Sequence, residues 1–186
     1  MMGMKMAINR HAVCMRPCPG FERRARIIAH IPWFQKFLQR FVPRYVVWED
    51  DSTNLVTTAG KNKVLDAALK GGLTTPAWYI GLVDNASWGA GYAAGDILSS
   101  HAGWIEAAQY TGNRKAWTPG TISAGSVDNV GSTAVFAMNN TVTVRGCFMC
   151  DAASGTRGTL LGEGDFSSSR ALISGDTLSV TATVTV

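Results

Sequence analysis

The sequence is poor in charged residues, in cysteine and in long apolar runs, and each shortage excludes a class of protein. Charged side chains make up 16% of the 186 residues and hydrophobic ones 46%, a balance that favours a packed core over disorder. No stretch reaches the roughly 20 apolar residues of a membrane-spanning helix, and residues 1–26 lack the apolar core of a secretory signal. We therefore expect synthesis in the cytosol, where the four cysteines are reduced thiols.

The basic side chains are concentrated near the start of the chain. Residues 1–47 carry nine basic side chains and one acidic one, a net charge of +8, whereas residues 48–186 carry eight basic and twelve acidic ones, a net charge of −4. This distribution predicts a basic arm attached to a mildly acidic body. Such an arm is suited to an acidic surface, which nucleic acid, an anionic membrane or a protein groove can provide.

Part of the arm has the periodicity of an amphipathic helix. Apolar side chains recur at intervals of three and four between Ile27 and Phe41, and Pro32 and Pro43 suit the two ends of a short helix over 32–42. This apolar face could bind a groove in a protein partner or pack on the chain's own domain. Nucleic acid and membrane are further alternatives. We expect the protein partner, with ten contact residues in the arm: Arg23, Arg24, Arg26, Ile27, Ile31, Trp33, Phe34, Phe37, Leu38 and Phe41.

After the arm, the body has mainly the patterns of β-strands. Residues 177–186 alternate strictly between apolar and Ser/Thr side chains, and residues 141–149 alternate with Val142, Val144 and Phe148 on one face. This alternation predicts antiparallel strands with one buried face. Twenty glycines and the short spacing of the strands favour a β-sandwich or jelly roll.

One helix interrupts the β pattern, over residues 58–70. Thr58 is a suitable N-cap, and Gly71-Gly72 a suitable C-terminal stop. We expect four apolar side chains to face inward: Val64, Leu65, Ala68 and Leu69. We also expect turns at 50–52, and a long packed or functional connection over 84–103.

The cysteines could in principle form a zinc site from Cys14, Cys18, Cys147 and Cys150. Residues three apart in a straight strand point to opposite faces, however, so Cys147 and Cys150 are poorly placed to share a metal. We interpret the thiols as small buried hydrophobic groups. No metal and no other cofactor is expected.

Two groups of residues have side chains of the types used in hydrolysis. Asp96, Ser100 and His101 match a catalytic triad in type, but they crowd into one connection, where His101 is better suited to anchoring the chain. Glu163 and Asp165 flank a glycine and suggest a turn, or at most a weak calcium site. Neither pattern predicts an enzyme, and we expect no catalytic residue.

Residues 48–186 carry several ordered blocks: Trp48-Glu49-Asp50 with Asn54 to Asn62 and Leu65-Asp66, Trp78 to Asp84, Asp96 with Ser99 to Glu106, Tyr110 and Arg114, Gly146-Cys147-Phe148, Gly155 to Leu160, Gly164-Asp165-Phe166 and Ser174 to Leu178. Together these blocks resemble a family of small structural proteins of tailed bacteriophages. The resemblance implies a virion protein of the capsid cement or decoration type, and no catalytic residues. Residues 1–44 differ from the short β segment with which such proteins usually begin.

These observations predict a mainly β protein: an antiparallel β-sandwich or jelly roll over 45–186, and a basic N-terminal arm with an amphipathic helix over 1–44. The predicted function is a structural subunit of a phage virion, made in the host cytoplasm. The expected partners are the major capsid protein, other virion proteins and further copies of the chain. A head–tail connector, tail or fibre-anchoring component, or a glycan-active enzyme, are the alternatives.

Overall fold

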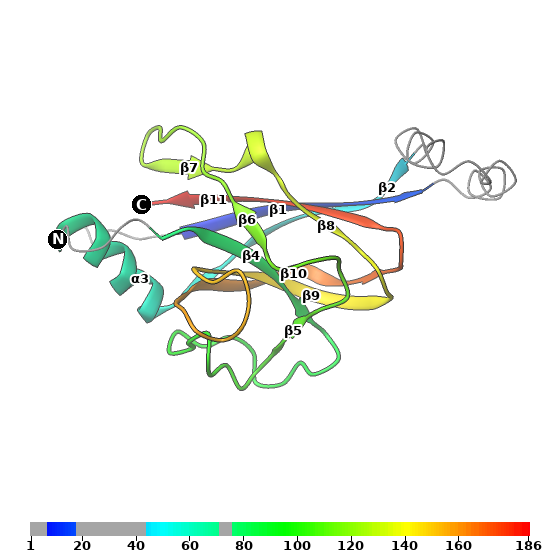
Figure 1. The fold of residues 1–186 in the computed structure, drawn as a ribbon, viewed down its shortest axis with the longest axis horizontal. Coiled ribbons are helices and arrows are strands. Elements are labelled where there is room, and N and C mark those ends of the chain that lie inside the picture. The colour runs from blue at the N-terminus through cyan, green and yellow to red at the C-terminus, as the bar shows by residue number, and fades with distance from the viewer. Residues whose placement is uncertain (1–6, 18–43, 71–75) are drawn as a thin grey trace, which may run out of the picture.

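The computed structural model describes residues 7–17, 44–70 and 76–186, which form two antiparallel sheets that face each other (Figure 1). The first sheet contains β1 (Ala7–Pro17), β2 (Arg44–Thr53), β7 (Ser126–Asp128), β8 (Ala134–Ala137) and β11 (Thr177–Thr185). The second contains β3 (Leu55–Val56), β4 (Trp78–Asp84), β5 (Ile105–Ala107), β6 (Lys115–Trp117), β9 (Val142–Cys150) and β10 (Leu160–Leu172). The predicted mainly β, sandwich-like architecture is confirmed.

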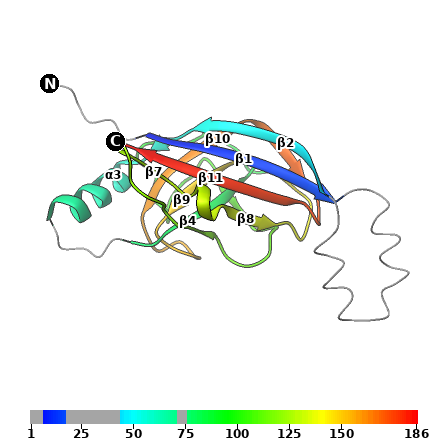
Figure 2. The same cartoon turned by 90° about the horizontal axis from the view of Figure 1, so that it is seen from above.

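The first and last strands, β1 and β11, pair with each other in the first sheet. The first sheet runs β2-β1-β11-β7, with β8 also paired to β11, and the second runs β3-β10-β9-β4-β5, with β6 paired to β4. Figure 2 shows β1 and β11 side by side along the length of the sandwich. Ala7 pairs with Thr185 at one end of this ladder, and Met15 pairs with Thr177 toward the other.

Strand β1 corrects the predicted boundary of the arm. Residues 7–17 lie between β2 and β11 in the first sheet, although the sequence placed them in an arm over 1–44. Ala12 and Cys14 are fully buried, while His11, Val13 and Met15 are partly exposed. The short run of alternating burial explains the strand, but its inward side chains are too small to give a strong signal. The amphipathic helix over 32–42 and all ten partner-binding residues lie outside the described residues.

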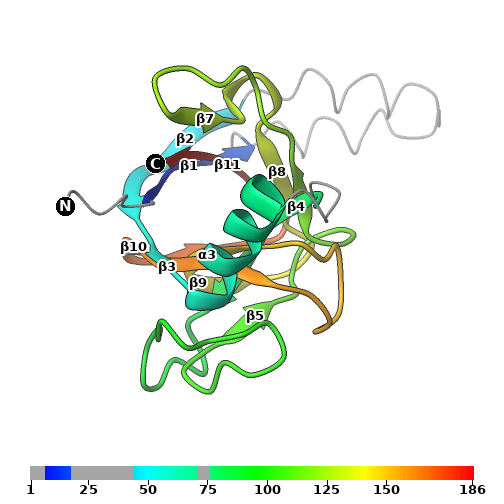
Figure 3. The same cartoon turned by 90° about the vertical axis from the view of Figure 1, so that its left-hand side faces the viewer.

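The helix predicted over 58–70 is present as α3 (Thr58–Leu65), which continues into the π-helical turn η1 (Asp66–Lys70). Its N-cap is Thr57, whose hydroxyl accepts a hydrogen bond from the Gly60 amide at 3.0 Å. Figure 3 shows the helix lying across one end of the sandwich. The predicted inward face is wrong for Leu65, Ala68 and Leu69, which are exposed, because the helix contacts β10 on the side of Gly60.

The predicted alternation in β9 changes phase at Arg145. Val83 and Asp84 of β4 pair with Gly146 and Val144, so Arg145 is an extra residue in the ladder, a β-bulge. Cys147 therefore joins Val144 in the core between the sheets, where the sequence placed it on the opposite face. Phe148 instead faces the other side of the second sheet.

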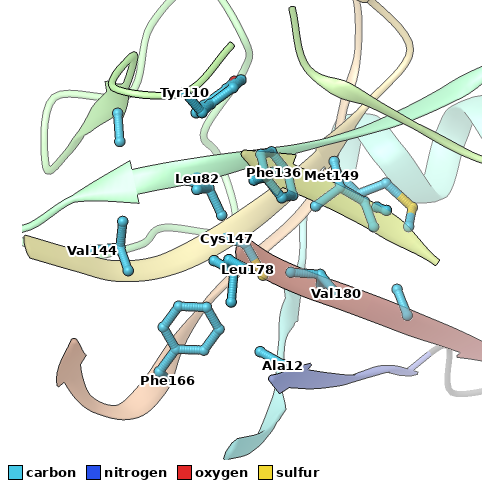
Figure 4. Packing of buried hydrophobic residues seen from close by; sticks show 14 of the residues in the cluster. Ala12, Leu82, Tyr110, Phe136, Val144, Cys147, Met149, Phe166, Leu178 and Val180 are labelled. Carbon is cyan, nitrogen blue, oxygen red and sulfur yellow. The ribbon is translucent and has the colours of Figure 1, made fainter. Parts of the chain in front are cut away.

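Two predicted turns are also wrong, because both segments lie inside strands. Residues 50–52 continue β2, and Glu163 with Asp165 lies within the long strand β10. Asp50 is buried and is bound to Arg170 and Ser167 of β10, which favours an extended chain there. Figure 4 shows the main core between the sheets, where Leu82, Phe136 and Leu178 come together from three strands.

Candidate interaction surface

An apolar groove opens at the end of the sandwich that α3 crosses. Its volume is about 420 Å³. We call it the helix-end groove, and its lining comes from both sheets and from the helix: Lys63, Val64, Ala67, Ala68, Pro76, Trp78, Trp117, Ile122, Gly125, Ser126, Val127, Leu161, Val184 and Val186. Apart from Lys63 and Ser126, every one of these side chains is apolar, or absent in the case of Gly125. The groove therefore continues the core of the sandwich toward solvent.

The helix approaches the second sheet most closely near its N-terminus. Gly60 is buried against the backbone of Leu161, and Thr57 holds the helix start through its hydroxyl, which donates to the Leu160 carbonyl. Beyond Gly60, Val64 still packs against the core, while Leu65 and Leu69 face solvent. The space below it is walled by Trp78 and Trp117, which pair across β4 and β6.

Two exposed apolar side chains lie among the residues that line the groove. Ile122 is 75% exposed and Val186 57%. Lys63 contributes little free charge because its ammonium group lies 3.6 Å from the Asp151 carboxylate. Clustered exposed apolar side chains on a soluble protein mark a surface that contacts another molecule.

The outer face of the first sheet has a different character. Ser179 and Thr181 of β11 are partly exposed between fully buried neighbours, as the alternation predicted, and Thr183 is partly exposed beside the buried Ala182. On the adjacent strands His11 lies between two carboxylates, at 3.1 Å from Glu49 and 2.9 Å from Asp51. This hydroxyl-rich face can form many modest polar contacts without a large apolar patch.

Asp96, Ser100 and His101 do not form a triad in the structure. Asp96 accepts a hydrogen bond from the Ala93 amide at 3.1 Å, and the Ser100 amide donates to the Ile97 carbonyl at 2.9 Å. The His101 ring stacks on Trp104 at 3.8 Å and contacts the Trp104 carbonyl oxygen through Nδ1 at 3.0 Å. Each residue thus shapes the connection over 84–103.

Glu163 is the buried acid that sequence reasoning missed. It is fully buried in β10 opposite Phe148, on the sheet face that the connection over 84–103 covers. Neither carboxyl oxygen makes a hydrogen bond of normal geometry within the described part of the chain. Burial, and to a smaller extent the nearby Asp96 carboxylate, raise the pKa of Glu163 to about 8 against smaller opposing effects of Trp104 and Ala93.

Asp165 lies only two residues away but has a different environment. Arg145 donates to its Oδ2 from two nitrogens, at 2.9 and 2.7 Å. Glu163 has no cationic partner among the groups that affect its pKa. The two acids therefore do not act as a pair, and the turn or calcium site suggested by their spacing is not formed by this geometry.

The described cysteines lie in two separate apolar clusters. Cys14 and Cys147 belong to the core between the sheets, whereas Cys150 lies with Phe148 under the connection over 84–103. Burial raises the pKa of Cys14 to about 12 and also raises the pKa of Cys150. Among the described residues no three His, Cys, Asp or Glu side chains come together as metal ligands, and Cys18 lies outside them.

Comparison with known proteins adds no assignment for these surfaces. No protein-family model matches the chain, and no curated protein matches it either. None of the helices in the described residues is long and apolar enough to cross a membrane. The helix-end groove and the hydroxyl-rich sheet face are therefore judged on their own chemistry.

Proposed function

We propose that this protein is a structural subunit of a tailed-phage virion, of the capsid cement type, and that it stabilises the shell through protein–protein contacts. The observation that carries the proposal is the helix-end groove, with Ile122 and Val186 exposed in its lining. A compact sandwich with an open apolar end is suited to binding a neighbouring protein.

The positions of the phage-like blocks support the same proposal. Asp50, from the first block, is buried and paired with the partly exposed Arg170, and Asp176, from the last, is buried and paired with the partly exposed Arg16. Arg114, from a middle block, is held by Glu106 at 2.6 Å. The blocks therefore include the buried acids Asp50 and Asp176 and the Arg114–Glu106 pair, as expected if a family of virion proteins shares one scaffold and varies its outer surfaces.

A shell contains many copies of its subunits, so weak contacts between neighbours can add up to a stable assembly. One subunit held by a single apolar groove binds weakly, but neighbours in a shell engage many such contacts at once. The hydroxyl-rich face of β11 adds polar contacts that do not cause unspecific aggregation. The major capsid protein is the expected partner, and the shell is the site of action.

The copy number in purified virions tests the proposal. Quantitative mass spectrometry against the major capsid protein, combined with electron microscopy of virions lacking this protein, would measure both amount and effect. We expect dozens to hundreds of copies and heads that lose DNA more easily when heated. About six or twelve copies would instead support the connector or tail alternative, and absence from the virion would refute any structural role.

A further inference from the structure

We propose that Glu163 and Asp96 form a pH-sensitive latch on the connection over 84–103. The two carboxyl groups hold the connection closed over the second sheet while they share one proton, and loss of that proton to solvent releases it. The latch operates within one copy of the chain. It can therefore be measured on the purified protein, independently of the proposed virion role.

The connection over 84–103 covers the outer face of the second sheet, on the side away from the first sheet (Figure 3), and packs on it as a small apolar core. Leu98 and Trp104 are buried there, and the Trp104 ring lies 4.9 Å from that of Phe148. This cluster is separate from the main core between the sheets. The connection can therefore open without separating the two sheets.

Backbone hydrogen bonds attach the connection to other elements at two places in the described chain. The Asn85 amide donates to the Thr143 carbonyl at 2.9 Å, and the Ala94 carbonyl accepts from the Thr58 amide at 2.9 Å. The closed position therefore depends largely on side chains. Asp96, two residues after Ala94, places a carboxylate at this part of the connection.

Glu163 is the acid that lies beneath the connection. It is fully buried, and within the described residues neither of its oxygens, nor the Trp104 indole nitrogen, makes a hydrogen bond of normal geometry. Asp96 acts on it from the connection, where the Ala93 amide donates to Asp96 Oδ2 at 3.1 Å and fixes that carboxylate. Closing the connection thus brings two carboxyl groups together in an apolar site, which is costly when both are charged.

The surrounding elements supply no free cation to balance these charges. The other titratable and charged groups that face this region are Tyr92 and His101 on the connection, Asp84 on β4, Glu106 on β5 with Arg114 after it, Arg145 and Cys150 on β9, Asp165 on β10 and Lys63 on α3. Each of the three cations in this list already has a carboxylate partner, at 2.6 Å for Arg114, 2.7 Å for Arg145 and 3.6 Å for Lys63. Strand β3, which pairs with Glu163 through Leu55, carries no charged residue.

One shared proton is the arrangement that stabilises the closed form. A protonated Glu163 places an O–H donor beside the Asp96 carboxylate, so the pair carries one negative charge instead of two. The pKa of Glu163, raised from 4.5 to about 8 by burial and by Asp96, has the direction that this arrangement requires. Because the closed form binds the proton more tightly than the open form, the equilibrium shifts toward the open form as the pH rises from about 4.5 to about 8.

Release of the latch changes the surface of the protein. The Tyr92 ring lies 4.8 Å from Trp88 and 6.3 Å from Trp104, so these rings form one aromatic group above Phe148. Opening exposes this group and the buried Leu98 to water. The fold therefore contains a proton-controlled change between a closed face and an aromatic one.

Hydrogen exchange followed by mass spectrometry tests the latch, on the purified full chain at pH 5, 7 and 9, with rates corrected for the intrinsic effect of pH on amide exchange. Peptides from 85–102 report on the connection, and peptides from β11 report on the sandwich. We expect the connection to exchange at least about tenfold faster than β11 at each pH, because it opens locally. Its opening equilibrium should increase by more than about thirtyfold between pH 5 and pH 9.

Three variants identify the groups responsible. Glu163→Gln keeps the size of the side chain but cannot ionise, so it should remove the pH dependence of the connection. Asp96→Asn supplies an amide that can donate to an ionised Glu163, so it should reduce the increase with pH by about threefold or more. Glu49→Gln is the matched control, because Glu49 is exposed on the other sheet, and it should behave like the unmodified chain.

Exchange of the connection no faster than that of β11 would overturn the proposal, since the connection would then open only when the whole protein unfolds. A corrected exchange rate that does not change with pH in the unmodified chain would also overturn it. So would an increase that Asp96→Asn leaves intact, because the pair would then not be the latch. If Glu163→Gln does not fold, the unmodified chain and Asp96→Asn still decide between these outcomes.

Discussion

Arg16 donates two hydrogen bonds to the carboxylate of Asp176, at 2.9 Å to Oδ1 and 3.0 Å to Oδ2. The pair joins the end of β1 to the turn that precedes β11. Asp176 is 1% exposed and also accepts a hydrogen bond from the Ile173 amide at 3.0 Å. The two parallel hydrogen bonds fix the geometry of this contact as well as adding to its strength.

We expect Asp176→Ala to destabilise the protein by about 3 kcal/mol, because it leaves the partly buried Arg16 cation and the Ile173 amide without their partner. Urea unfolding followed by tryptophan fluorescence would measure the loss. Glu49→Ala is the control, since Glu49 is 60% exposed and pairs only with the exposed His11. Glu49→Ala should lower the free energy of unfolding by less than about 0.5 kcal/mol. Equal losses of stability in the two variants would contradict the idea that the buried ion pair contributes more than the exposed one.

The buried Glu163 should make stability depend on pH. Its pKa is raised from 4.5 to about 8 in the folded protein, so the folded state retains a proton that the unfolded state releases. The contribution of this group is complete below about pH 4.5 and declines as the pH rises toward 8, by about 1.4 kcal/mol per pH unit. We expect Glu163→Gln to abolish this decline.

Melting temperatures at pH 5, 7 and 8.5 for both proteins would check the prediction. The melting temperature of Glu163→Gln minus that of the wild type should increase with pH and level off above about pH 8. Asp165→Asn provides the comparison, because the Asp165 side chain is 32% exposed and paired with Arg145. A difference between wild type and Glu163→Gln that stays constant across the three pH values would show that Glu163 is ionised in the folded state.

Strands could be predicted from the sequence where buried and exposed residues alternate regularly. They could not be predicted correctly where a β-bulge reverses which residues of the strand face the core. The Ser/Thr and apolar alternation of β11 matched the structure, as did the helix over 58–70. Strand β10 was missed because Gly162 to Ser169 contains few apolar residues, and because its register shifts after Leu160 and again after Asp165. A single extra residue, Arg145, was enough to move Cys147 to the other face of β9.

The groove could not be predicted for a different reason. Its walls come from residues far apart in the chain, including Val64, Trp117 and Val186, which become neighbours only when both sheets have formed. The exposed Leu65 and Leu69 have the same helical spacing as a buried face, so periodicity alone placed them inside. The Glu163 site was hidden likewise, since its environment is set by Asp96 and Trp104 in a separate connection.

Gly60 should be intolerant of any side chain. A Cβ atom there would lie 2.5 Å from the Leu161 carbonyl oxygen and 2.6 Å from the Leu161 Cα, and neither backbone atom can move easily. We expect Gly60→Ala to cost about 1–3 kcal/mol through overpacking, despite the better helix propensity of alanine. Gly95→Ala, with nothing within 4 Å of the new Cβ, should be near neutral by the same unfolding measurement.

The three described thiols should be protected in the folded protein. Cys14, Cys147 and Cys150 are fully buried, and burial raises the pKa of Cys14 to about 12, so thiolate is scarce and reagent access is blocked. We expect iodoacetamide at pH 8 to label these three positions far more slowly in native protein than in urea, as peptide mass mapping would show. Fast native labelling of Cys150 alone would mean that the connection over 84–103 opens readily, because that connection covers the cluster around Phe148 to which Cys150 belongs. Fast labelling of Cys14 as well would instead mean that the strands of the first sheet separate, and would contradict the central position of β1.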